Sequence, residues 1–142
     1  VLRTSEASTG VALINVATGG AEASKNFITI VSGANGLLSP ADVASAGPTV
    51  AGARVLVCQL EIKMETTLAA LRAARAAGVT TVFNPAPAPA SLPDDLLPLC
   101  DIVCPNETEL EALLPGAIDV DDLESVCAGA LALLEKGARG KI

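Results

Sequence analysis

Residues 54–60, with the sequence RVLVCQL, decide the fold, because such a near-continuous apolar run is typical of a parallel strand buried on both faces. A helix rich in Ala, Leu and Arg is expected over residues 65–77, and Gly78 would end it. Residues 79–83, VTTVF, predict the next buried strand. A strand, a helix and a second strand in this order indicate a parallel sheet with crossover helices.

The chain after residue 83 continues the same alternation. A helical turn is expected within residues 94–99, a short strand over residues 101–104, and helices over residues 107–114 and 120–136. The last helix would begin after Asp119 as its N-cap and end at Gly137. Its apolar residues recur at helical spacing and predict one buried stripe, formed by Leu123, Val126, Cys127, Ala130, Leu131 and Leu134.

The chain before residue 54 reads differently. Residues 10–17 and 26–31 predict two strands of a hairpin, with a turn at Thr18-Gly19-Gly20. A loop of small residues is expected over residues 32–36, after which Ser and Pro at 39–40 open a short helix. The hairpin is either an appendage or the start of the sheet.

Composition limits the classes of function. The 142 residues fit one domain or part of one, since single domains commonly have about 100–200 residues. The chain contains no His, which excludes Ser-His-Asp and Cys-His nucleophile systems and HExxH zinc sites. The net charge of −7 argues against non-specific binding of nucleic acid, which needs a basic face. The first residue is Val rather than Met, so the chain need not begin where its gene does.

The location is inferred from what the sequence lacks. No apolar run approaches the ~20 residues of a membrane span, and no signal peptide is recognisable. The cysteines are too sparse for a disulfide framework and too widely spaced for a zinc site. We therefore expect a soluble protein in the cytoplasm, with an organelle left open. The four cysteines are Cys58, Cys100, Cys104 and Cys127.

Polar side chains follow each of the three predicted parallel strands. The ends are Gln59-Leu60-Glu61, residues 84–88 (NPAPA) and residues 105–109 (PNETE). Ligands of open parallel sheets bind beyond the carboxyl ends of the strands. One carboxylate and two carboxamides at one edge therefore predict a site for a polar ligand.

Each of these features also has a structural interpretation. Glu61 can be the first solvated residue past a strand, and residues 84–88 can be a rigid loop. Asn106 followed three residues later by Glu109 has the spacing of a helix capping box. In the functional interpretation, Asn106 donates to a phosphate oxygen and Glu109 holds magnesium directly or through water. Both interpretations stay open at this point.

Taken in order, these segments resemble the central part of the phosphofructokinase-B type family of carbohydrate kinases. The resemblance begins with residues 8–14 (STGVALI) and 33–40 (GANGLLSP), and continues through the three strand ends described above. It covers nearly the whole chain. The NPAPA and NETE segments are specific in combination, whereas either one alone would be weak.

The resemblance implies a ribokinase-like, three-layer α/β/α fold with a mostly parallel, Rossmann-like sheet, with the hairpin near a lid. Residues 1–142 would be a partial, incomplete domain of this kind. The implied reaction is phosphorylation of a sugar by ATP, typically D-ribose to D-ribose 5-phosphate. The implied cofactors are ATP and Mg²⁺, and the complete proteins of the family are expected to use a monovalent cation, K⁺.

The resemblance also implies roles for four residues. Glu61 would bind sugar hydroxyls, and Asn106 would contact the nucleotide phosphate. Asn84 would lie near the same phosphate pocket, and Glu109 would help to organise magnesium. The lid of this family covers the sugar and often mediates dimerisation, so the resemblance allows a homodimer through the lid of a full-length protein.

Two motifs of the family are missing from the sequence. Neither the N-terminal sugar-binding Gly-Gly…Asn motif nor the C-terminal Gly-Ala-Gly-Asp motif, which holds the catalytic base and anion hole, is present. Phosphoryl transfer needs a residue that accepts the hydroxyl proton. No catalytic residue is therefore assigned, and the chain by itself is expected to be inactive.

Three alternatives remain at this stage. The chain can come from another sugar or nucleoside kinase of the family, such as a fructokinase or a 2-keto-3-deoxygluconate kinase. It can instead be a non-catalytic truncated remnant that only associates with partners. A generic dinucleotide-binding domain is the third, although the sequence lacks G-x-G-x-x-G after the first parallel strand.

Overall fold

The structure, a computed structural model, describes residues 2–18 and 26–140. The chain divides into two compact units, Val1–Leu38 and Ser39–Ile142, which are treated in turn. The predicted turn at Thr18-Gly19-Gly20 extends outside the described residues. No helix in the described ranges is long and apolar enough to cross a membrane.

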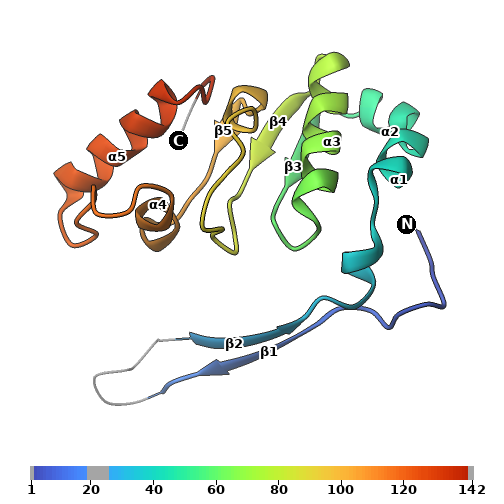
Figure 1. Cartoon of the computed structure of the whole chain (residues 1–142), viewed down its shortest axis with the longest axis horizontal. Helices are drawn as coiled ribbons and strands as arrows, with labels where there is room; N and C mark the ends of the chain where they lie inside the picture. Colours follow the sequence, from blue (N-terminus) through green and yellow to red (C-terminus); the bar gives the residue numbers. More distant parts are fainter. Residues whose placement is uncertain (1, 19–25, 141–142) are drawn as a thin grey trace. The chain divides into compact units, whose positions relative to one another are not determined.

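The first unit is a β-hairpin. Strands β1 (Val11–Val16) and β2 (Asn26–Val31) pair antiparallel, with Val11 opposite Val31, and form a two-stranded sheet of their own (Figure 1). The hairpin predicted from the sequence is therefore confirmed. Every residue of β1 is exposed, although five of the six are apolar.

The two segments at the base of the hairpin approach each other closely. The Ala34 N–H donates to the Ser8 carbonyl oxygen over 2.8 Å. Gly33 has a φ of +51°, and a Cβ added there would lie 2.4 Å from the same oxygen. Only glycine fits this position. The segment Gly33–Leu37 forms a 3₁₀ helix, η2, where the sequence predicted only a loop.

The second unit contains the predicted parallel sheet. Its strands are β3 (Val55–Cys58), β4 (Thr80–Phe83) and β5 (Ile102–Val103), in the order β3-β4-β5. Helix α3 (Met64–Ala76) connects β3 to β4 and is followed by Gly78 at φ +71°. The strand–helix–strand prediction is confirmed, with each strand shorter than expected.

Further helices complete the unit. Helix α1 (Pro40–Ser45) begins at the predicted Ser39 N-cap, and α2 (Gly47–Ala51), which the sequence did not predict, follows it. Both pack against α3. Beyond β4 come the 3₁₀ turn η3 (Leu97–Leu99), α4 (Glu107–Leu113) and α5 (Leu123–Glu135) (Figure 1).

One face of the sheet is covered and the other is open. Cys58, Phe83 and Val103 point into a core shared with α3, α4 and α5. The alternate residues Val55 and Val57 are 49% and 65% exposed. The prediction that residues 54–60 are buried on both faces is therefore wrong for the described residues. An apolar run does not by itself show which of its two faces is covered.

Helix α5 differs from its prediction in two respects. Its N-cap is Asp122 rather than Asp119, because the Asp122 carboxylate accepts from the N–H groups of Glu124 and Ser125. The core side of the helix centres on Gly129 and Leu133. Half of the predicted buried stripe is exposed instead, namely Leu123, Cys127 and Leu131. Helical spacing identifies an apolar stripe wider than the surface that this helix buries.

A polar cluster ties α3 to the amino ends of the strands. Asp101 accepts from the Arg75 guanidinium over 2.8 Å and from the Thr81 N–H over 2.9 Å. The fully buried Thr81 hydroxyl lies 2.7 Å from the Leu99 carbonyl oxygen and 3.1 Å from the Asp101 carboxylate. The Thr81 backbone N–H above all, with the Thr81 hydroxyl and Arg75, holds the pKa of Asp101 below its ordinary value.

This cluster predicts a pH-dependent stability. The unfolded pKa of Asp101 is about 3.9 and the folded pKa is lower, so its carboxylate stabilises the fold above about pH 4. That contribution is lost as the pH falls through the folded pKa. We expect Asp101→Asn to lower the urea midpoint near neutral pH, and to differ less from the parent near pH 3. Asp95→Asn, which breaks an exposed ion pair with Arg72, is the matched control and should change little. An Asp101→Asn deficit of equal size at both pH values would contradict the assignment.

Candidate functional site

The candidate site lies along the carboxyl edge of the β3-β4-β5 sheet, where the three strand ends are tied together (Figure 1). The Asn84 N–H donates to the Cys58 carbonyl oxygen over 2.9 Å, and the Cys104 N–H donates to the Phe83 carbonyl oxygen over 2.8 Å. The Leu60 N–H donates to the Ala86 carbonyl oxygen over 2.9 Å. The structure thus brings together the three segments in which the sequence placed its site residues.

Glu61 leaves β3 in a turn that its neighbours hold in place. The hydroxyl of Thr67, which is fully buried in α3, donates to the Gln59 carbonyl oxygen over 3.1 Å. Glu61 itself is half-buried, and within the described ranges its carboxylate makes no hydrogen bond or ion pair. The carboxylate is therefore available to accept from the hydroxyl groups of a ligand.

Asn84 uses the two ends of its side-chain amide differently. Its Oδ1 accepts from the Ala86 N–H over 3.1 Å, which closes a local turn around the buried Pro85. Its Nδ2 donates to no residue in the described part of the chain. The amide can therefore still donate to an anion.

Asn106 and Glu109 form the capping box that their spacing predicted. Asn106 Oδ1 accepts from the Glu109 N–H over 2.8 Å, and Glu109 Oε2 accepts from the Asn106 N–H over 2.9 Å. Asn106 Nδ2 also donates to Glu109 Oε1 over 3.2 Å, and the Thr108 hydroxyl donates to Asn106 Oδ1 over 2.8 Å. The structural interpretation is confirmed. It still leaves one N–H of Asn106 and one lone pair on each Glu109 oxygen without a partner in the box.

The donor set fits magnesium held through water better than magnesium held by protein alone. Among residues 2–18 and 26–140 no group of three His, Cys, Asp or Glu side chains is close enough to hold a metal ion. Glu109 therefore belongs to no such group among these residues. Mg²⁺ usually keeps several water ligands and binds through one or two carboxylates together with substrate phosphates. The residues present fit that arrangement.

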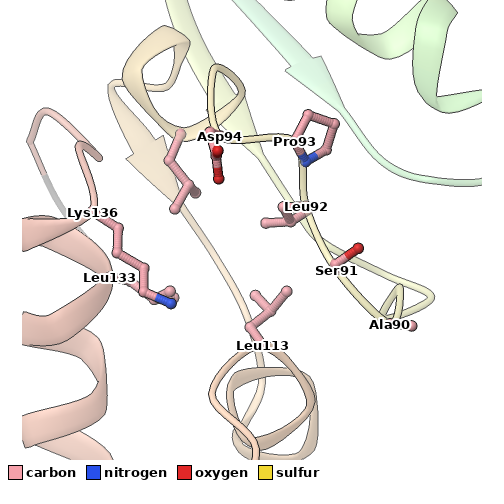
Figure 2. A pocket seen from close by; sticks show the side chains of 9 residues that line it. Ala90, Ser91, Leu92, Pro93, Asp94, Leu113, Leu133 and Lys136 are labelled. Atoms are coloured by element: carbon pink, nitrogen blue, oxygen red, sulfur yellow. The ribbon is translucent and has the colours of Figure 1, made fainter.

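Two cavities lie near α4, and the sequence predicted neither of them. A cavity of about 390 Å³ adjoins Asn106 and lies between α4 and α5. A second cavity of about 330 Å³ is lined by residues 90–94, by Leu113 of α4, by Leu133 of α5 and by Lys136, which directly follows α5 (Figure 2). The second cavity contains none of the predicted site residues. Loop residues that form such walls carry no periodic signal in a sequence.

The buried cysteines offer no nucleophile to this edge. Burial raises the pKa of Cys58 to about 11 and that of Cys100 to about 12. A thiol must ionise to act as a nucleophile. Cys58 and Cys100 therefore serve as small apolar residues of the core.

Comparison with known proteins gives consistent matches. The family model described as "pfkB family carbohydrate kinase" matches residues 1–141. A ribokinase of Mus musculus is 42% identical over 137 residues, and a ribokinase of Staphylococcus aureus is 45% identical over 113 residues. The solved structure of Arabidopsis thaliana ribokinase complexed with ribose and ATP superposes with a TM-score of 0.72 at 26% identity, over 96% of this chain and 41% of that one.

The chain is much shorter than the relatives it matches. The alignments cover 96% of this chain but 41% of the mouse protein, and 80% of this chain but 36% of the Staphylococcus protein. The matched part includes all three strand ends at the carboxyl edge of the sheet.

Proposed function

The chain belongs to the pfkB family of carbohydrate kinases, and from that premise we propose that it supplies the central part of a kinase that phosphorylates D-ribose with ATP. The observation that carries the proposal is the joined carboxyl edge of the sheet. There the Glu61 carboxylate, the amide N–H groups of Asn84 and the remaining amide N–H of Asn106, none of which has a partner in the described part of the chain, extend from neighbouring strand ends.

Glu61 is the sugar-binding residue of this proposal. Its carboxylate has no partner among the described residues, and a carboxylate accepts strongly from hydroxyl groups. The similar Arabidopsis ribokinase was solved in complex with ribose and ATP, which supports ribose as the sugar. The product is D-ribose 5-phosphate.

The nucleotide phosphate and magnesium are bound, in this proposal, by Asn106, Asn84 and Glu109. The remaining N–H groups of Asn106 and Asn84 would donate to phosphate oxygens, and Glu109 would hold magnesium directly or through water. When bound, magnesium neutralises charge on the transferred phosphoryl group. The capping box keeps Asn106 and Glu109 in one orientation, so little rearrangement is needed when the ligand arrives.

Residues 1–142 account for positioning but not for proton transfer. They contain no Gly-Ala-Gly-Asp motif, and we propose that the catalytic base, the anion hole, the nucleotide-base contacts and the site for K⁺ lie outside residues 1–142.

We also propose that the protein is located in a reducing intracellular compartment, either the cytoplasm or an organelle. Its four cysteines, all free, suit such a compartment.

The hairpin is proposed as the lid and as the contact of a homodimer. One face of the hairpin carries Leu13 and Phe27, and the other carries Ile14 and Ile28. These four side chains are 53% to 62% exposed. An isolated two-stranded hairpin is at best marginally stable in water, so packing against further structure would stabilise it. One face would close over the sugar and the other would meet a second copy of the chain.

The function is tested by placing residues 8–138 into the corresponding segment of the mouse ribokinase. We expect this chimaera to phosphorylate ribose with ATP in preference to fructose or 2-keto-3-deoxygluconate, and Glu61→Gln to raise KM for ribose roughly tenfold or more. A hydrogen bond to a charged group contributes about 1.5–3 kcal/mol. The 142-residue chain alone should consume no ATP. A folded chimaera that prefers another sugar, or an unchanged KM in Glu61→Gln, would disprove the proposed substrate or role.

Two substitutions of Glu109 distinguish its proposed role in binding magnesium from its role in capping α4. Gln can replace Glu in a capping box, so Glu109→Gln in the chimaera should keep its thermal stability. It should nevertheless lower turnover strongly and shift the magnesium dependence, because the charge is lost. Glu109→Ala should lower both stability, by about 0.5–2 kcal/mol, and turnover. Should Glu109→Gln keep full turnover, the residue is only a cap.

The dimer is tested with one charged substitution on each face of the hairpin. Leu13→Lys and Ile14→Lys are compared by sedimentation of the chimaera and by KM for ribose. We expect one variant to become monomeric and the other to remain dimeric with a raised KM. If both variants remain dimeric, the hairpin is not the contact between copies.

A further inference from the structure

We propose that Asn84 is a positioning residue whose side-chain carbonyl holds the Leu60–Glu61 turn in place through the backbone of Ala86. The inference rests on the proposed function in one respect, namely that Glu61 binds the sugar. Its structural part is independent of any activity.

The link consists of two hydrogen bonds in series. Asn84 Oδ1 accepts from the Ala86 N–H over 3.1 Å, and the Ala86 carbonyl oxygen accepts from the Leu60 N–H over 2.9 Å. Ala86 thus uses both of its backbone groups, one toward Asn84 and one toward the turn. A rotation of either peptide group of Ala86 would disturb one of the two bonds.

The prolines around Ala86 make this link hard to replace. Pro85 and Pro87 have no N–H group, so Ala86 supplies the single backbone donor of residues 85–87. Pro85 is fully buried, which anchors the loop at its first residue. Residues 85–87 therefore hold no second N–H that could take over the bond to Asn84.

The link through Ala86 holds the turn before Glu61 at Leu60. Gln59 is held from the other side by the buried hydroxyl of Thr67, over 3.1 Å. The two residues that precede Glu61 are therefore each fixed by one backbone hydrogen bond. Since the Glu61 carboxylate has no partner of its own in the described ranges, the backbone of the turn is what sets the point from which this side chain extends.

The two ends of the Asn84 amide can be tested separately. Asn84→Asp keeps an oxygen that can accept from the Ala86 N–H, but it removes the Nδ2 donor proposed for phosphate. Asn84→Ala removes both groups. The positioning role and the phosphate role therefore predict different results for the same pair of variants.

The first measurement is amide hydrogen exchange in the 142-residue chain itself. Asn84→Ala should speed exchange of the Leu60 and Ala86 amides about 2- to 10-fold, as expected for the loss of a bond that contributes about 0.5–1.5 kcal/mol. Asn84→Asp should stay close to the parent chain. The Cys104 amide, which donates to Phe83 at the same edge, is the internal reference. Equal exchange of Leu60 in all three chains would overturn the link.

The second measurement separates KM for ribose from KM for ATP in the chimaera. We expect Asn84→Ala to raise KM for ribose several-fold and Asn84→Asp to restore it, while Asn84→Asp raises KM for ATP. Thr81→Val, which loosens the opposite end of the sheet, is the control and should lower stability without changing KM for ribose.

Each outcome identifies what has failed. If Asn84→Asp raises KM for ribose as much as Asn84→Ala, the positioning role is wrong. If Asn84→Asp restores KM for ribose but leaves KM for ATP unchanged, the proposed phosphate contact of Asn84 is wrong and its positioning role is retained. A chimaera without ribose kinase activity, together with altered Leu60 exchange in Asn84→Ala, would overturn the proposed function and retain the link.

Discussion

The parallel register around Phe83 is the constraint on which the rest of the second unit depends. Phe83 is fully buried and pairs with Cys58 on one side and Val103 on the other, so three strands end at the same level. Its carbonyl oxygen also accepts the N–H of Cys104. A change of register by one residue would turn this side chain to the open face and separate the strand ends that carry the candidate site.

The two ends of the sheet perform different tasks. At the amino ends of β4 and β5, the side chains of Asp101, Thr81 and Arg75 are hydrogen-bonded to one another. At the carboxyl edge, backbone groups make the connections, while the Glu61 carboxylate and Asn84 Nδ2 have no partner among the described residues. This division follows from chain direction, because all three strands run the same way and every loop after a strand emerges at one edge.

Structural and chemical interpretations of a motif can share one geometry. The hydrogen bonds that cap α4 also orient the free N–H of Asn106 and the remaining lone pairs of Glu109. Asn84 likewise combines a structural group with one that is available to a ligand. Its side-chain oxygen accepts from its own loop, while its side-chain nitrogen donates to no described residue. A capping box found in a sequence is therefore no argument against a ligand role for the same residues.

Short-range signals in the sequence were enough for the family and for most of the local structure, although not for η2, α2 or the N-cap of α5. Apolar runs and helical spacing identified the strands and α3, while Ser39 and Asn106 marked helix starts through bonds spanning three residues. Tertiary structure alone decided which face of β3 is covered and that Leu123 and Leu131 of α5 are exposed. It also decided that Ala86 connects Asn84 to Leu60. Burial and contacts between distant segments depend on what packs against each element, and that information is not contained in its own spacing.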